Sequence, residues 1–204
     1  MKKLSLLAVA LLAAAPMLAN AESAFTTGTG TPITAAARLD FRVTVPKILY
    51  LQVGSGTNMA ANSTINLIDF TVNAANVGDG TQVAATAGSG DLGNGVVTAK
   101  LVGNNGTISF SSATSGALNS GTDTISYAQI STAAAINTSA TALPAPALAD
   151  GATTTISVAP ASGKVVNQDA KWTYKYLNTA IVAPGTYGGV NANNGRVTYT
   201  ASMP

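Results

Sequence analysis

The sequence contains no cysteine and no histidine, and these two absences remove most of the side-chain chemistry on which enzymes depend. Without cysteine there is no disulfide, no thiol nucleophile and no thiolate metal ligand. Without histidine a Ser–His–Asp triad cannot form, and no side chain has an unperturbed pKa near neutral pH. We therefore expect a protein that is not an enzyme, with no cofactor and no metal site.

Charge is also scarce, since charged residues make up 9% of the chain against the usual quarter. The ten basic residues include Lys2 and Lys3, so eight basic residues remain against eight acidic ones beyond residue 21. They are scattered along the chain and form no basic patch. Nucleic acid is therefore not an expected partner.

Three weaker chemical patterns have simpler explanations. Ser162 and Lys164 could pair as nucleophile and base, but they lie in a turn-like Gly/Pro-flanked stretch. The aspartates could pair as in a glycosidase, but several lie in Gly/Asn turns, where Asp is favoured for backbone bonding alone. The Gly88–Gly95 stretch suggests a calcium loop, but it lacks the spaced carboxylates that such a site needs.

The first 21 residues match the three parts of a signal peptide. Lys2 and Lys3 precede the apolar stretch Leu4–Ala15, and Ala19-Asn20-Ala21 supplies the small residues of a cleavage site. We predict cleavage between Ala21 and Glu22 and export to the periplasm, the cell surface or the extracellular space. The apolar stretch is shorter than the ~20 residues of a membrane span, and no later segment is longer, so no transmembrane segment is expected after cleavage.

The rest of the chain is predicted to be an all-β, Ig-like antiparallel β-sandwich with long loops rich in Gly, Asn, Ser and Thr. Residues 22–37 are small and polar and are interpreted as a flexible lead-in, and residues 38–204 as a single domain. About nine short segments alternate apolar and polar residues between turn signals. The expected strands include Leu39–Val45, Ile48–Val53, Ile65–Val72, Trp172–Tyr176, Thr186–Val190 and Arg196–Ala201. Val96–Val102 and Thr107–Ser111 are expected to form a hairpin through Asn104-Asn105-Gly106, and Ala133–Gly151 a long loop of undetermined role.

Two sets of residues are candidates for function. Leu39, Phe41, Val43 and Val45 place four apolar side chains on one face of an extended segment, which suits insertion into a groove by β-strand addition. Trp172, Tyr174 and Tyr176 share a strand face, which favours a place in the sandwich core. The alternative for these three is an exposed platform that stacks on sugars.

Parts of the sequence resemble subunits of chaperone–usher fimbriae, especially the archaic and spore-coat-U-like branch. The resemblance rests on Ala183-Pro184-Gly185-Thr186-Tyr187, on the alternating stretch Arg196–Ala201 and on Leu39–Val45. It implies an incomplete Ig-like sandwich completed by a neighbour's donated strand. It also implies like subunits as partners, with a periplasmic chaperone and an outer-membrane usher in assembly.

The sequence therefore supports two functional hypotheses. The first is an exported structural or adhesive subunit, pilin-like, that polymerises by strand donation. The second is a monomeric secreted binding module for a carbohydrate or another surface ligand. They differ in whether Leu39–Val45 pairs with a neighbour or within its own domain, which the sequence alone does not decide.

Overall fold

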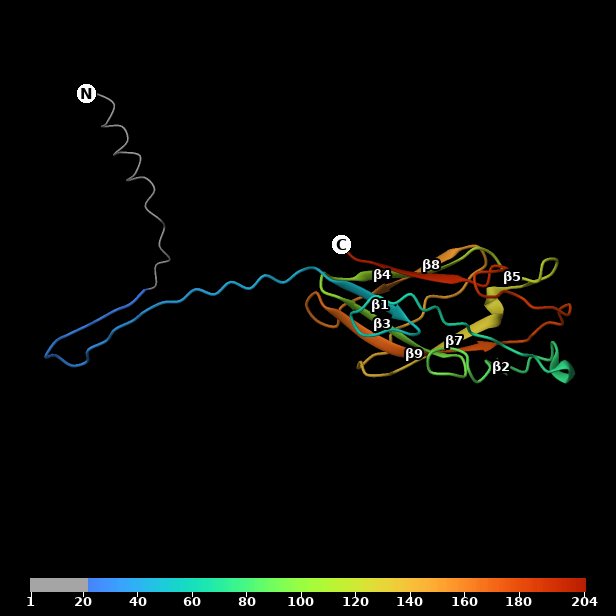
Figure 1. Ribbon diagram of the computed structural model, residues 1–204, viewed down its shortest axis with the longest axis horizontal. Helices are drawn as coiled ribbons and strands as arrows, with labels where there is room; N and C mark the ends of the chain where they lie inside the picture. The colour runs from blue at the N-terminus through green and yellow to red at the C-terminus, as the bar shows by residue number, and fades with distance from the viewer. Residues whose placement is uncertain (1–21) are drawn as a thin grey trace, which may run out of the picture. The chain divides into compact units, whose positions relative to one another are not determined.

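The computed structural model describes residues 22–204 (Figure 1). The predicted signal peptide lies outside these residues. The chain divides into two units at Val45 and Pro46, and every strand of the described part lies in the second, residues 46–204. The strands are β1 (Leu49–Val53), β2 (Val83–Ala84), β3 (Val96–Gly103), β4 (Ile108–Thr114), β5 (Leu118–Asn119), β6 (Thr124–Ile125), β7 (Ile130–Ala135), β8 (Thr153–Val158), β9 (Val166–Tyr176) and β10 (Val197–Ser202). Two short 3-10 turns, η1 (Ala74–Asn76) and η2 (Tyr127–Gln129), complete the elements.

The strands form antiparallel sheets, which confirms the all-β, sandwich-like architecture. The larger sheet has the order β1-β3-β9-β2, with β7 pairing the other edge of β9. The second sheet has the order β10-β4-β8, and β5 and β6 form a separate ribbon. No helix of residues 22–204 is long and apolar enough to cross a membrane.

The core lies between the two main sheets and follows the alternation of their strands. Along β3, Val97, Ala99 and Leu101 point inward and are buried, because successive side chains of a strand face opposite sides of the sheet. They meet Ile108 and Phe110 of β4 from the facing sheet. Burial of this kind has to stabilise the chain without help from disulfides.

The expected hairpin between Val96–Val102 and Thr107–Ser111 does not form. Asn104-Asn105-Gly106 does reverse the chain, with Gly106 at φ 99°, but it leads from β3 in one sheet to β4 in the other. The Gly106 N–H donates to the carbonyl of Lys164 rather than across a hairpin. The local turn signal was correct, and the pairing inferred from it was wrong.

Residues 136–152 form a loop that side chains hold against the sandwich, so the loop predicted from Ala133 begins later, because Ala133–Ala135 pair with β9 as the end of β7. The Asp169 carboxylate accepts hydrogen bonds from the backbone N–H groups of Thr138 and Ser139 at 2.9 and 2.8 Å. Although burial of Asp169 acts to raise its pKa, these bonds and those from the two hydroxyls outweigh it and hold the pKa well below its usual value. Further along the loop, Ser112 donates to the carbonyl of Ala147 at 2.8 Å. The loop therefore has a structural role.

Candidate functional site: an open groove between the sheets

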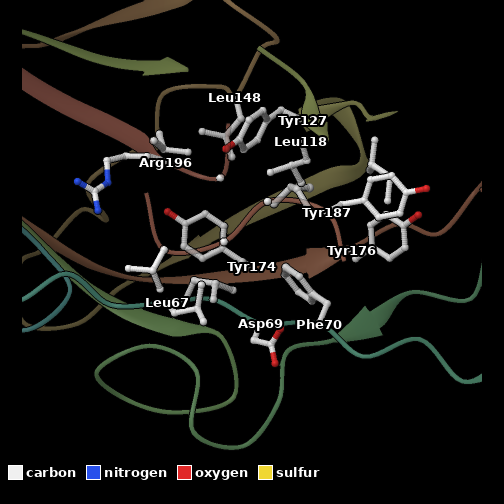
Figure 2. Close-up of a pocket in the computed structure, with 18 of the residues that line it drawn as sticks. Leu67, Asp69, Phe70, Leu118, Tyr127, Leu148, Tyr174, Tyr176, Tyr187 and Arg196 are labelled. Atoms are coloured by element: carbon white, nitrogen blue, oxygen red, sulfur yellow. The ribbon is translucent and has the colours of Figure 1, made fainter. Parts of the chain in front are cut away.

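One side of the sandwich is open, and a groove of about 1070 Å³ runs along it (Figure 2). One wall comes from β1 and the segment Ile65–Val72, and the other from the start of β10 and Val182–Val190. The floor carries Tyr174 and Tyr176 of β9. All of these residues belong to the unit 46–204.

The segment Ile65–Val72 is extended but has a free edge. Its side chains alternate, with Ile68, Phe70 and Val72 turned partly inward and Ile65 and Leu67 exposed. The prediction of a strand at Ile65–Val72 is wrong, because the backbone bonds of this segment go to loop residues and not to a neighbouring strand. The carbonyls of Leu67 and Asp69 accept hydrogen bonds from the N–H groups of Gly90 and Thr86 at 3.1 and 2.8 Å.

Alternate residues of an extended chain direct their backbone groups to opposite edges. Within residues 22–204, the backbone groups of Ile68 and Phe70 have no such partner. The edge that they form is therefore free to pair with another strand.

The opposite wall ends in a second free edge. Within the described residues, β10 pairs with β4 alone, so one of its edges carries no neighbouring strand. At one end of β10, Ala201 and Met203 pack against the core and the two sheets close. From Tyr199 toward Arg196 the strand lines the groove instead.

The segment Thr186–Val190, expected to be a hairpin partner of β10, is irregular. Gly188 and Gly189 have φ values of 79° and 146°, and three of the following asparagines, Asn191, Asn193 and Asn194, also have positive φ. Such a run of left-handed residues cannot continue a β-strand. The predicted strand is therefore absent, and the segment forms one wall of the groove.

Tyrosine side chains give the interior of the groove a mixed apolar and hydroxyl character. The hydroxyls of Tyr174 and Tyr199 lie 2.9 Å apart in a hydrogen bond, and Tyr127 donates to the carbonyl of Asn194 at 2.7 Å. Burial raises the pKa of Tyr127 to about 12, with smaller contributions from the charges of Tyr199 and Asp150. Burial likewise raises the pKa of Tyr174 well above its usual value. These phenols stay protonated and neutral at physiological pH.

The candidate platform of Trp172, Tyr174 and Tyr176 is not exposed. The relative exposures of the three side chains are 0%, 6% and 5%. Trp172 packs on Phe110 at 6.0 Å, and its indole N–H donates to the carbonyl of Leu143 at 2.8 Å. A ring enclosed in this way offers no face to a sugar, so the platform alternative is wrong. Trp172 lies in the core, and the two tyrosines form the floor of the groove.

Two charged residues, Asp69 and Arg196, are the only ones among the residues that line the groove. They lie on opposite walls, and their charged ends point away from the tyrosines (Figure 2). Within residues 22–204 the single ion pair joins Glu22 and Arg38, so neither Asp69 nor Arg196 has an ionic partner there.

The N-terminal unit carries the other candidate set. In its described part, residues 22–45, the chain forms no helix and no strand. Leu39, Phe41, Val43 and Val45 are 73–85% exposed, an unusual state for four alternating apolar residues. Arg38, which precedes them, is held by Glu22, with the two side chains 2.7 Å apart.

Sequence reasoning identified this exposed segment but missed the groove. The sequence pattern predicts only an ordinary strand for the wall Ile65–Val72, and it does not mark Asp69 or Arg196 as functional. No local signal distinguishes these two residues, because Asp40, Arg42 and Lys175 also lie within alternating runs.

Comparison with protein-family models, with curated proteins and with solved structures finds no match to this chain.

Proposed function

We propose that this protein is an exported structural or adhesive subunit whose copies join by strand donation, and that it is not an enzyme. In this proposal Leu39–Val45 of one copy enters the open groove of the next. The observation that carries it is the presence, in one chain, of an exposed apolar segment and an open groove between two unpaired strand edges.

The dimensions of the segment and the groove agree. Leu39–Val45 has seven residues and, at ~3.3 Å per residue, extends over about 23 Å. The wall Ile65–Val72 has eight residues and extends over about 26 Å. Its free edge at Ile68 and Phe70 and the free edge of β10 supply backbone donors and acceptors for the added strand.

The free energy of insertion has two contributions. Full burial of the four apolar side chains would contribute about 6–12 kcal/mol. The loss of translational and rotational freedom costs about 4–15 kcal/mol, so side-chain burial alone does not ensure a lasting junction. Durable assembly therefore also depends on hydrogen bonds between the added strand and the free edges.

The position of the donating segment in the chain favours a head-to-tail filament. Pro46 and Lys47 follow it directly and lie at the end of the sandwich where β1 pairs with Gly103. The groove extends toward Tyr176, at the other end of β9. A contact between two different ends of like subunits is heterologous, and when its rotation does not close it builds an open filament.

The proposed location and partners of the protein rest on the sequence pattern and the resemblance. The signal-peptide pattern of residues 1–21 supports export to the periplasm or beyond. The fimbrial resemblance of Ala183–Tyr187 and Arg196–Ala201 adds a periplasmic chaperone and an outer-membrane usher as proposed assembly partners. The alternative, a monomeric binding module for a carbohydrate or another surface ligand, predicts that Leu39–Val45 pairs within its own domain.

The test uses the full mature chain, Glu22–Pro204. Sedimentation velocity and gels run without boiling should show polymers that resist mild denaturant. Phe41→Asp should abolish them, because a carboxylate cannot enter the apolar groove uncompensated. Phe25→Asp is the matched control, since Phe25 is 91% exposed in the same unit but lies outside the donating segment, and it should polymerise normally.

A mature chain that stays monomeric at the highest attainable concentration would refute strand donation. Protection of the Leu39–Val45 amides from hydrogen exchange within that monomer would show that the segment pairs inside its own chain. Equal loss of polymer in Phe41→Asp and Phe25→Asp would also count against the proposal, because it would not assign the effect to the donating segment.

A further inference from the structure

The groove and the donating segment carry matching charges. Of the residues that line the groove, one is acidic, Asp69, and one is basic, Arg196. The donating segment also carries one of each between its apolar residues, Asp40 and Arg42. Arg38, the other charge next to the segment, is already paired with Glu22.

The alternation of a strand separates the two kinds of contact. When Leu39, Phe41 and Val43 point into the groove, Asp40 and Arg42 point out of it, toward the rim. The rim is also where the charged ends of Asp69 and Arg196 lie, turned away from the tyrosines (Figure 2). Asp40 and Arg42 would therefore meet the rim charges without entering the apolar interior.

The order of the charges along the groove fixes their pairing. In Figure 2, Arg196 lies toward the Leu67 end of the groove, and Asp69 lies between Leu67 and Tyr176. Asp69 is next to Phe70, whose ring centre is 6.4 Å from that of Tyr176. In the head-to-tail arrangement, Val45 and the donor's body lie at the Tyr176 end, so Arg42 comes closer to that end than Asp40 does.

We propose that Asp69 and Arg196 set the register of the donated strand, with Asp69 pairing Arg42 and Arg196 pairing Asp40 of the neighbouring copy. This inference rests on the proposed function and names the residues that determine its specificity. A shift by one residue would turn the apolar side chains outward. A shift by two would keep the apolar face inward but separate the charge pairs. The charges therefore add to the discrimination between registers that keep the apolar face inward.

The size of the effect follows from the exposed position of the pairs. Ion pairs at a solvent-accessible rim contribute little to affinity and act mainly on the association rate and its salt dependence. We expect reversal of either side to slow polymer formation by about fivefold at low salt, with the difference shrinking as salt is added.

The experiment is a charge-reversal cycle on the full mature chain. The donor variant is Asp40→Arg with Arg42→Asp, the groove variant is Asp69→Arg with Arg196→Asp, and the third variant combines all four. Each reversal alone should slow polymerisation, and the combination should restore the wild-type rate. Reversal of Lys171 and Asp123, which lie outside the groove lining, is the matched control and should leave the rate unchanged.

Far-UV circular dichroism checks that each variant is folded. The neutral pair Asp69→Asn with Arg196→Gln provides a milder groove variant, whose polymerisation rate should no longer depend on salt. The inference is overturned when wild type polymerises and either reversal does so equally fast, or when the fourfold variant stays slow. A wild-type chain that forms no polymer overturns the proposed function, and this inference with it.

Discussion

Replacing Trp172 with alanine is expected to lower the free energy of unfolding by about 4–6 kcal/mol. Trp172 is fully buried, stacked on Phe110 at 6.0 Å and tilted against Tyr199 at 5.5 Å. Truncation of a buried tryptophan costs about 3–5 kcal/mol. The loss of its 2.8 Å hydrogen bond leaves the carbonyl of Leu143 unpaired in the core, which adds about 1 kcal/mol. Domains of this kind have total stabilities of about 5–15 kcal/mol, so the loss is a large fraction.

Urea unfolding followed by far-UV circular dichroism measures this change. It should be repeated at two protein concentrations, because assembly would raise the apparent stability. Trp172→Phe keeps an aromatic ring on Phe110 and should lose less than the alanine variant. Because Trp172 is the only tryptophan, the fluorescence of the wild type should be blue-shifted and should report unfolding directly. A Trp172→Ala loss below about 1 kcal/mol, with an unchanged m-value, would refute the assignment of Trp172 to the core.

Three further measurements test the hydrogen-bonded parts of the fold. Because its folded-state pKa is lowered, Asp169 contributes stability that is complete above the unfolded pKa of about 3.9 and is lost as pH falls below it. Asp169→Asn should therefore lower the free energy of unfolding at pH 7 by about 2 kcal/mol. In urea titrations its stability should also fall less steeply than that of the wild type as the pH is lowered. Asn178 is buried at φ 54° and binds the N–H of Gly78, so Asn178→Ala should destabilise by about 1–2 kcal/mol more than Asn178→Gly in thermal melts, since alanine adds left-handed strain. Tyr127 has a raised folded-state pKa of about 12, so its contribution to stability is complete below the unfolded pKa of about 10 and is lost as pH rises toward 12. Tyr127→Phe should therefore reduce the loss of stability between about pH 10 and about pH 12. An unchanged loss of stability would contradict the buried, neutral state of Tyr127.

The elements that sequence reasoning placed correctly are those whose signal is local. Trp172–Tyr176 and Val197–Ala201 alternate strictly, and the structure has them in β9 and β10 with alternating burial. Alternation arises from the pleat of a single strand, so it can be read without knowing the partner. The partner itself is a long-range property. The Asn104-Asn105-Gly106 turn was read correctly, whereas the sheet to which each flanking strand belongs was not.

In the candidate site, too, local features could be predicted from the sequence and long-range ones could not. Leu39–Val45 could be identified because its four apolar residues stand out between a polar lead-in and Pro46. The groove wall could not be identified from the sequence, because Ile65–Val72 has the pattern of any half-buried strand. Its free edge depends on which segments are absent beside it, and no residue of the segment encodes that absence.

The anchoring at the root of the N-terminal segment bears on how the molecule would carry tension. Asn104 donates to the carbonyl of Pro46 at 2.8 Å and accepts from the N–H of Ile48 at 2.9 Å, and Lys47 donates to the carbonyl of Pro204 at 2.6 Å. A pull on the N-terminal segment would therefore pass directly into β1, along the strand and across its five residue pairs with β3. Load applied along a strand shears its backbone bonds together instead of opening them one at a time, so a filament of such subunits would yield only at forces that break several bonds at once.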